Sequence, residues 1–248
     1  MNAEKQRDMI VQAIKDWFSQ NAPLASAVIG ISGGKDSTIA AALLVRALGK
    51  ERVYGVLMPC GIQPDIDDSK RVVQVLGINQ ITVNIQKPYE DLQKGFWPAG
   101  IPISKDAQVN LQPRIRMATL YMVAQSLPTG GIVINTCNRS EDYVGYATKF
   151  GDCAGDISIL GDLLVSQVLE IGDTLEEIPK DLVHKTPSDG LWGDSDEDRL
   201  GFTYDQLEDY ILKGTTANKE IDEKILHLHK TTRHKYTPMP SLSQQLIK

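Results

Sequence analysis

The sequence is poor in cysteine, in basic charge and in long apolar runs, and each shortage narrows the class of protein. It contains three cysteines, none of them in a C-x-x-C pair. A structural zinc site is therefore not expected, and an odd number of thiols suits a reducing, cytoplasmic environment. Acidic residues exceed basic ones, 32 against 26, and this imbalance argues against a nucleic-acid partner. No apolar stretch reaches about 18 residues, so we expect no membrane-spanning helix.

The remaining composition is that of an ordinary globular protein. Hydrophobic residues make up 42% of the chain and charged residues 23%. A chain of 248 residues fits a single α/β domain, so we expect residues 1–248 to form one domain. The first residues are polar and run into a helical pattern, which predicts no secretory signal.

The most informative segment is Ser26–Ser37, in which a short β-rich run leads into the hexapeptide SGGKDS at 32–37. Its two glycines lack a Cβ, which lets the backbone approach a ligand closely. The expected helix after it directs free N–H groups and a positive dipole end at the turn. Asp36 adds a carboxylate, a ligand that suits a hard cation. The segment therefore predicts a pyrophosphate site with a magnesium ligand built in.

Two better-known phosphate loops do not fit this segment. The P-loop of kinases and GTPases needs glycine where the chain has Ile29, and Ser or Thr where it has Asp36. The dinucleotide fingerprint needs a second glycine two residues after the first, but Ser32 stands two residues after Gly30. The hexapeptide instead resembles the S-G-G-x-D-S loop of the ATP pyrophosphatases, which cleave ATP between its α and β phosphates. An ordinary glycine-rich turn between a strand and a helix is the plain alternative.

Short β-rich runs alternate with helical patterns through the first half of the chain. The expected strands are Ala27–Ile31, Arg52–Met58, Gln80–Ile85 and Gly130–Asn135. The expected helices are an N-terminal one that ends at Pro23, then Ser37–Leu48, Asp65–Leu76 and, after a loop, Ser104–Ser126. This alternation predicts a doubly wound parallel sheet with flanking helices, a Rossmann-like α/β fold. Ligands of such sheets bind at the carboxyl ends of the strands, where Ser32 and Thr136 fall.

The rest of the chain is expected to be helical, with one long polar loop at Lys185–Gly201. That loop is rich in Asp, Ser and Gly and is longer than ordinary connections. We therefore expect it to be a functional lid or to be partly disordered.

A second cluster of polar residues follows the fourth expected strand. Thr136 ends that strand, and Ser140-Glu141-Asp142 resembles a helix start. A carboxylate at this place faces the phosphate loop, which makes Glu141 a candidate second metal ligand. Taken alone, Glu141 is also explained as a first-turn residue that complements the helix dipole.

Together with three further segments, these motifs resemble the NAD synthetase family over most of the chain. The stretch Asn110–Tyr121 is similar to the family's Asn/Arg/Arg-Met/Tyr helix, and Ser140–Asp152 is similar to its central signature. Lys185–Asp205 resembles its mobile loop, and 234–235 resembles its closing His-Lys pair. The resemblance implies an adenine nucleotide α-hydrolase-like form of the predicted fold, and a homodimer.

The resemblance also implies an activity, the ATP-dependent amidation of deamido-NAD to NAD with release of AMP and pyrophosphate. Members of this length lack a glutaminase domain and use free ammonia. We accordingly expect a cytoplasmic ligase that forms a C–N bond, with ATP, deamido-NAD and ammonia as substrates and Mg²⁺ as cofactor.

Roles for individual residues follow from the same resemblance. Residues expected to bind ATP are Gly30, Ile31, Ser32, Gly33, Gly34, Lys35, Asp36, Ser37, Thr136 and Ser188, the last where many members have Thr. Residues expected to contact deamido-NAD are Arg114, Lys149, Asp156, His234 and Lys235. Asp36 and Glu141 are the expected magnesium ligands, and with Asp156 they are the expected catalytic residues. Asp156 or Asp152 is also a candidate for binding ammonium or taking its proton.

One position departs from the family pattern. Many members place a lysine that reaches the ATP phosphates where this chain has Val165, and valine carries no charge. Either the reaction proceeds without that lysine or another cation takes its place. The sequence offers Lys35, Lys185 and Arg199 as candidates.

The expected mechanism activates a poor acyl donor. A carboxylate oxygen of the nicotinate attacks the α-phosphorus of ATP, pyrophosphate leaves, and ammonia then displaces AMP from the acyl-adenylate. Magnesium and the loop N–H groups offset the charge that develops on the leaving group. Such catalysis depends on positioning and needs no nucleophilic side chain.

Two other classes share parts of this pattern. A tRNA-modifying relative, a ligase or a thiolase, has the same loop but is expected to carry a basic face or a redox cysteine pair, and the sequence shows neither. A non-catalytic nucleotide-binding module has a similar sheet, but it does not need Asp36 and Glu141 together.

Overall fold

The computed structural model describes residues 2–63, 66–185 and 196–241, and within them the chain forms one sheet in the order β3-β2-β1-β4-β5. The strands are β1 (Ser26–Gly30), β2 (Val53–Leu57), β3 (Asn79–Thr82), β4 (Gly131–Asn135) and β5 (Ile157–Ser158). Each neighbouring pair of these strands is parallel. The predicted doubly wound parallel sheet is therefore confirmed.

The order of the strands reverses direction between β1 and β4. From β1 the chain moves outward to β2 and β3, and it then returns to the other side of β1 with β4 and β5. Ile29 is in register with Ile134, so β1 and β4 end at the same level. A ligand crevice forms at the carboxyl ends of the strands where a doubly wound sheet reverses in this way.

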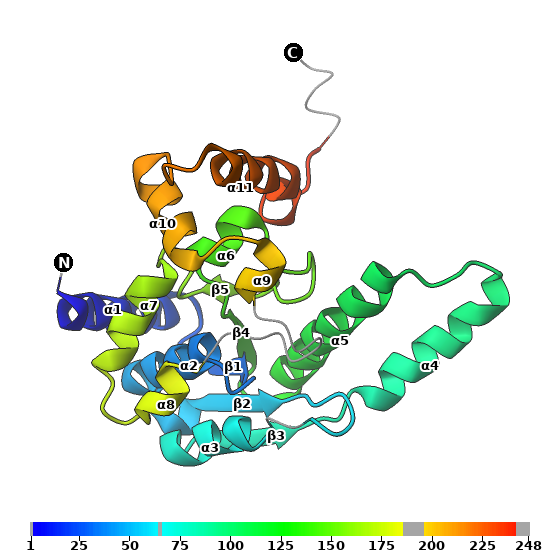
Figure 1. Cartoon of the computed structure of the whole chain (residues 1–248). Coiled ribbons are helices and arrows are strands. Elements are labelled where there is room, and N and C mark those ends of the chain that lie inside the picture. The colour runs from blue at the N-terminus through cyan, green and yellow to red at the C-terminus, as the bar shows by residue number, and fades with distance from the viewer. Residues whose placement is uncertain (1, 64–65, 186–195, 242–248) are drawn as a thin grey trace.

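Helices lie on both faces of the sheet and beyond its carboxyl edge (Figure 1). They are α1 (Ala3–Asn21), α2 (Lys35–Leu48), α3 (Ile66–Leu76), α4 (Gln86–Phe96), α5 (Lys105–Ser126), α6 (Arg139–Val144), α7 (Val165–Asp173), α8 (Lys180–Val183), α9 (Asp196–Leu200), α10 (Tyr204–Lys213) and α11 (Lys219–Thr232). Short 3-10 turns are η1 (Lys50–Arg52), η2 (Trp97–Ala99) and η3 (Arg233–Lys235). No helix in the described ranges is both long and apolar enough to cross a membrane.

The larger core lies between one face of the sheet and the helices α1, α2, α3 and α7. Within α2, the run Ile39–Leu44 has no exposed surface at all. A surface helix normally buries one apolar stripe, but α2 packs on β1 and is covered by α1 and α7 on its other sides. This burial fixes the start of α2, which immediately follows the phosphate loop.

The opposite face of the sheet is covered by α5. Val28 of β1, Val56 of β2 and Val133 of β4 point to this side and pack with Val123 of α5. Because side chains alternate along a strand, the same strands fill both cores.

A third core joins α6, α9, α10 and α11, which we call the cap, above the carboxyl ends of the strands (Figure 1). Glu208 of α10 is buried and secures the cap to the rest of the protein. Its Oε1 atom accepts a hydrogen bond from the Ser166 backbone N–H of α7 at 3.0 Å, and another from the Ser140 hydroxyl, within the cap, at 3.2 Å. The cap is thereby held over the crevice by a buried polar contact as well as by apolar packing.

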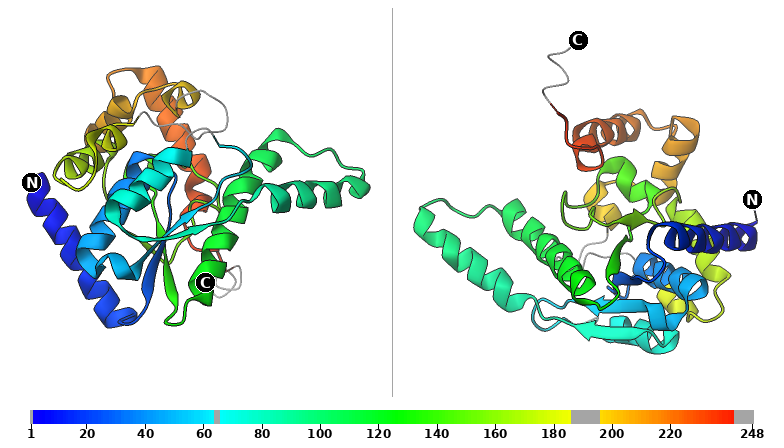
Figure 2. Two further views of the ribbon diagram at one scale, coloured as in Figure 1. Left: turned by 90° about the horizontal axis from the view of Figure 1, so that it is seen from below. Right: turned by 180° about the vertical axis from the view of Figure 1, so that it is seen from behind.

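The segment between Ile85 and Ser104 was expected to be a loop, and that expectation is wrong. It contains α4, which extends from the sheet beside α5 as an arm (residues 86–114; Figures 1 and 2). Pro88 and Gly95 obscure the helical pattern in the sequence. Pro88 occupies the first turn of α4, where a missing N–H removes no intrahelical hydrogen bond.

Two further expectations for the second half need correction. The strand β5 was not expected; it has two residues, too few to give an alternating pattern, and pairs with Ile134 and Asn135. The expected loop Lys185–Gly201 ends in the helix α9, whose acidic first turn complements the helix dipole. Residues 186–195 of that loop, Ser188 among them, lie outside the described residues.

Gly131 of β4 has no room for a side chain, so we expect Gly131→Ala to destabilise the fold. A Cβ there would lie 2.8 Å from the Ala124 Cα and 2.8 Å from the Val28 Cγ2. Overpacking of this kind costs about 1–3 kcal/mol. Gly95→Ala in α4 is the control, because nothing lies within 4 Å of its Cβ and alanine favours a helix. Urea unfolding of both variants and of the wild type measures the effect. If Gly131→Ala were as stable as the wild type, the packing of α5 on β4 would be contradicted.

Candidate active site

Hydroxyl groups of the loop between β1 and α2, and of the first turn of α2, hydrogen-bond to one another and to the loop backbone. The Ser32 and Ser37 hydroxyl oxygens lie 3.1 Å apart, and the Gly34 N–H donates to the Ser32 Oγ at 3.2 Å. The Thr38 hydroxyl donates to the Gly34 carbonyl at 2.7 Å. Gly34 is the N-cap of α2 and provides no side-chain cap, so no capping side chain stands between the first N–H groups of α2 and a ligand.

Gly33 is the position at which this loop requires glycine. Its φ is +79°, a conformation that other residues adopt only with strain. A Cβ there would also lie 2.8 Å from the Ser69 backbone nitrogen and 2.9 Å from the Asp68 Cβ. The N-terminus of α3 therefore presses against the loop and fixes its shape.

Asn138 joins the two carboxylates that the sequence singled out. Its side-chain N–H donates to Asp36 Oδ1 at 3.1 Å, and its Oδ1 accepts from the Glu141 backbone N–H at 3.0 Å. The Asn138 backbone N–H in turn donates to Glu141 Oε2 at 3.4 Å, which completes a capping box at the start of α6. Asn138 was not among the expected site residues, although an Asn followed three residues later by Glu is a recognisable helix-start signal.

Burial and neighbouring charges shift the pKa of Glu141 and of Lys35. Burial, together with the neighbouring charge of Asp36, raises the pKa of Glu141 to about 8, and Lys35 partly opposes the shift. Burial alone would lower the pKa of Lys35, but the carboxylates of Asp36 and Glu141 more than offset it and raise that pKa. The site is therefore short of positive charge in spite of the lysine within it.

The donor set fits magnesium that a substrate helps to bind. Among residues 2–63, 66–185 and 196–241, no three His, Cys, Asp or Glu side chains gather as a metal site. Mg²⁺ is typically bound by one or two carboxylates and completed by phosphate oxygens and water, and Asp36 and Glu141 supply such a pair.

A cavity of about 430 Å³ lies beside the phosphate loop, under the cap. Lys35 and Val165 both line it, as do Lys185 and Asp196. The Tyr146 and Tyr204 hydroxyls donate to the two oxygens of Asp196, at 3.0 and 3.4 Å. Of the three cations considered as substitutes at Val165, Lys35 and Lys185 share this cavity, whereas Arg199 is not among its lining residues.

Asp156, one of the residues expected to contact deamido-NAD, and Asp152 follow β4 in the chain, and both accept hydrogen bonds within the protein. Asp156 accepts hydrogen bonds from the Val133 backbone N–H at 2.7 Å and from the Tyr121 hydroxyl at 3.1 Å, so both of its oxygens are engaged. Asp152 accepts from the Thr148 backbone N–H at 2.8 Å. Both carboxylates therefore hold backbone or side chains in place.

The basic residues of this group lie in two places. The Arg114 Nε donates to the Lys149 carbonyl at 3.3 Å, which brings α5 against the central signature. The Lys235 ammonium donates to the Gly145 carbonyl at 2.6 Å and the Ala147 carbonyl at 2.7 Å, so it ties η3 to the backbone. His234, next to it, is exposed.

A second cavity, of about 420 Å³, separates Asp156 from η3. Lys235, Tyr236, Asp142 and Ser158 contribute to its wall. One carboxylate oxygen of Asp142 is buried and has no hydrogen-bond partner. Burial raises the pKa of this carboxyl group to about 6. The structure thus places Asp156 and Lys235 at one cavity and the phosphate loop, Asp36 and Glu141 at the neighbouring ends of β1 and β4.

Comparison with known proteins identifies relatives over the whole length of the chain. The family model for NAD synthase matches residues 7–245. The NH(3)-dependent NAD(+) synthetase of Pyrococcus furiosus is 34% identical, and the match covers 95% of this chain and 93% of that protein.

Two solved structures have the same fold. The NMN synthetase of Francisella tularensis superposes with a TM-score of 0.88 at 34% identity and covers 97% of this chain and 98% of its own. The NH3-dependent NAD synthetase of Campylobacter jejuni superposes with a TM-score of 0.76 at 24% identity, with 97% and 98% covered. At that lower identity the likeness shows the fold alone.

The raised pKa of Glu141 predicts a specific pH dependence in metal-free buffer. The pKa of the unfolded side chain is about 4.5, whereas that of the folded one is about 8. Between these values the unfolded state binds fewer protons, so stability falls as pH rises and levels off above pH 8. Glu141→Gln cannot ionise. We expect the melting temperature of this variant, measured in EDTA, to rise relative to that of the wild type as the pH increases from 5 to 8.

Glu170→Gln is the matched control, because it removes an exposed carboxylate on α7. Its melting temperature should follow that of the wild type across the same pH range. If the melting temperatures of Glu141→Gln and the wild type differed by the same amount at every pH, the pKa of Glu141 would not be raised by burial beside Asp36.

Proposed function

The chain belongs to the NAD synthase family, and we propose that it catalyses the ATP-dependent amidation of deamido-NAD to NAD with ammonia. The observation that carries this proposal is the family match over residues 7–245, since it includes both the phosphate loop after β1 and the central signature after β4. The geometry supports it, because Asp36 of the phosphate loop and Glu141 of the central signature meet through Asn138. We further propose that residues 1–248 act as one synthetase domain and work in the cytoplasm, where the three free cysteines stay reduced.

The loop from Gly30 to Ser37 binds the phosphates of ATP in this proposal, with Thr136 and Ser188 as further contacts. Asp36 and Glu141 hold Mg²⁺, and Asn138 keeps the two carboxylates at the spacing that its hydrogen bonds impose. When bound, the metal supplies positive charge against the leaving pyrophosphate. The first N–H groups of α2 donate to the same phosphates, and because they are fixed in place they need no reorganisation during the reaction.

The other half of the site positions the acid substrate. Arg114, Lys149, His234 and Lys235 contact deamido-NAD in this proposal, and Asp156 orders the end of β4 against α5. The nicotinate carboxylate then attacks the α-phosphorus, pyrophosphate leaves, and ammonia displaces AMP. The nitrogen nucleophile comes from the substrate, so these side chains bind and orient and do not attack.

A second candidate substrate is nicotinate mononucleotide. It is favoured by the NMN synthetase of Francisella tularensis, which superposes with a TM-score of 0.88 at 34% identity. The same amidation of this smaller acid yields NMN. The pyridine carboxylate is the same in both acids, so the two substrates differ only in the half that does not react.

Exchange of labelled pyrophosphate into ATP tests the function and distinguishes these substrates. We expect exchange that depends on deamido-NAD, and amide formation when ammonium is added. A higher kcat/KM with nicotinate mononucleotide would favour the second candidate. Exchange that needs neither acid, or needs tRNA, would contradict both.

Asp36→Asn should lower the exchange rate by about 10²-fold or more, because loss of a metal ligand removes several kcal/mol of transition-state stabilisation. Asp16→Asn, at an exposed position of α1, is the control and should exchange at the wild-type rate. Circular dichroism checks that both variants are folded. A rate for Asp36→Asn within a few-fold of the wild type at saturating Mg²⁺ would remove Asp36 from the site.

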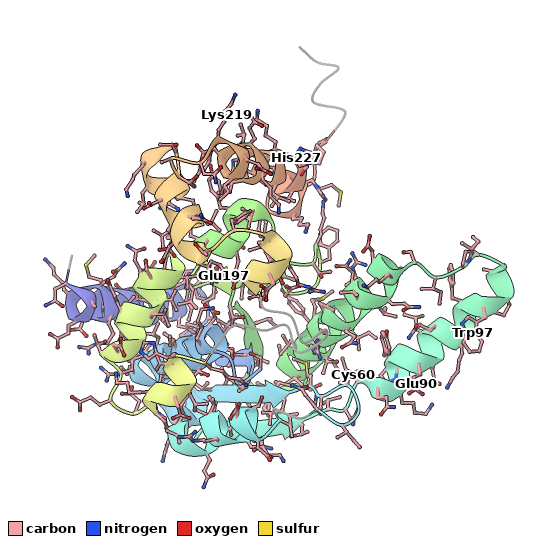
Figure 3. All side chains as sticks on the ribbon, viewed as in Figure 1. Cys60, Glu90, Trp97, Glu197, Lys219 and His227 are labelled. Atoms are coloured by element: carbon pink, nitrogen blue, oxygen red, sulfur yellow. The ribbon has the colours of Figure 1, made fainter. Side chains whose placement is uncertain are left out.

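The arm supports the proposal of a homodimer. It exposes large apolar side chains at Leu92 (56%), Phe96 (42%), Trp97 (66%) and Ile101 (62%), and no residue of α4 is buried. Trp97 lies on this arm, away from the sheet (Figure 3). An apolar helix face of this extent suits contact with a second copy of the chain.

We expect sedimentation equilibrium to give a dimer for the wild type and a monomer for Leu92→Glu combined with Trp97→Glu. The introduced carboxylates would be buried without partners in an apolar interface. Met9→Glu is the control, since Met9 is similarly exposed (53%) but lies on α1. A monomeric wild type, or a double variant that stays dimeric, would rule out assembly through the arm.

A further inference from the structure

The ammonium group of Lys35 is buried beside Asp36, one carboxylate of the proposed magnesium pair. Lys35 is only 4% exposed, and its Nζ lies 2.9 Å from Asp36 Oδ2. The other Asp36 oxygen accepts from Asn138, so lysine and asparagine hold this carboxylate from two sides. The ammonium also lies 5.7 Å from the centre of the Tyr204 ring, at cation–π distance. A lysine is rarely buried to this extent unless it is paired.

The carboxylates of Asp36 and Glu141 interact with Lys35, and they are also the proposed ligands of Mg²⁺. Asp196 of the cap also acts electrostatically on Lys35. A buried ion pair that loses one partner leaves an uncompensated charge, which is strongly destabilising. A protein that binds its metal together with a nucleotide therefore needs another counter-ion for these carboxylates before the nucleotide arrives.

Lys35 also borders the space next to Val165. Both residues line the cavity of about 430 Å³, and the Val165 side chain is apolar and almost fully buried. Lys185 shares the cavity, but its ammonium lies 2.6 Å from Asp68 Oδ2, at the start of α3. Lys35 is the candidate whose ammonium already contacts a proposed metal ligand. Its four-carbon stem gives the group freedom to move from Asp36 into the cavity.

We propose that Lys35 is a resident counter-ion of the Asp36–Glu141 pair in the metal-free protein. Its ammonium would leave this pair when Mg²⁺ is bound there and would then bind the polyphosphate of ATP beside Val165. This inference rests on the proposed function for its second step only. The first step concerns the metal-free protein and is measured without any substrate. In the second step, the lysine supplies the positive charge that position 165 lacks.

Mg²⁺ alone tests the first step. Lys35→Met removes the charge and keeps a flexible apolar side chain of similar length. We expect this variant to melt below the wild type in EDTA and to gain more in melting temperature than the wild type when Mg²⁺ is added without nucleotide. Lys180→Met is the matched control, since Lys180 is exposed on α8 and pairs with Asp173. It should respond to Mg²⁺ as the wild type does.

Nucleotide binding tests the second step. We expect Lys35→Met to bind ATP about tenfold more weakly in the presence of Mg²⁺, by titration calorimetry, because a charge-assisted contact is lost. Lys35→Met combined with Val165→Lys returns a positive charge to the same cavity. The double variant should recover most of the ATP affinity and of the pyrophosphate exchange, which a purely structural lysine would not predict.

Lys35→Arg covers the case in which the methionine variant does not fold. It keeps the charge, so it should be as stable as the wild type in EDTA and show the small wild-type response to Mg²⁺. Equal Mg²⁺ stabilisation of Lys35→Met and the wild type, with unchanged ATP affinity, would reduce Lys35 to a core ion pair and overturn the proposal. If the wild type exchanges pyrophosphate with neither acid, the proposed function fails, while the magnesium and ATP titrations still decide the role of Lys35.

Discussion

The structure depends on placing two carboxylates side by side in a largely buried site. Asp36 and Glu141 repel each other there, and burial away from water makes the repulsion stronger. Asn138 spaces them and Lys35 offsets part of their charge. Much of the surrounding architecture serves this arrangement. The rigid core under α2 fixes one carboxylate, and the capping box of α6 fixes the other.

The sheet brings the two halves of the site together because β1 and β4 are neighbours that end at the same level. The phosphate loop follows β1, and the central signature lies between β4 and β5. The cap then closes over this edge, held by the buried Glu208 and by the third core. Asp36, after β1, and Glu141, after β4, therefore meet at this edge, although more than a hundred positions separate them in the chain.

The acidic character of the site sets it apart from a phosphate site built of basic residues. In the described residues, Lys35 contacts Asp36, and Lys235 donates hydrogen bonds to the backbone carbonyls of Gly145 and Ala147. A site of this kind binds a polyphosphate well only together with a divalent cation. The proposed dependence on Mg²⁺ follows from this charge balance.

The sequence by itself determined the features that rest on local patterns. The hexapeptide at 32–37 and the alternation of strands and helices predicted the phosphate loop and the parallel sheet, because backbone conformation there follows from nearby residues. The pairing of Asp36 with Glu141 was also predicted, since strand ends of such a sheet meet at one edge. The arm was missed because Pro88 and Gly95 hide its helix, and β5 because two residues carry no period.

Only the tertiary structure decided how the site is held. Contacts between distant segments hold it: Asn138 bridges the two carboxylates, and Asp156 accepts hydrogen bonds from Val133 and Tyr121. Lys35 is buried beside Asp36 and lines a cavity with Val165. The residues next to Lys35 in the sequence do not predict that its ammonium group is buried. That outcome follows from the packing of α2 against the sheet and of the cap above it, and such long-range burial leaves no local trace in a sequence.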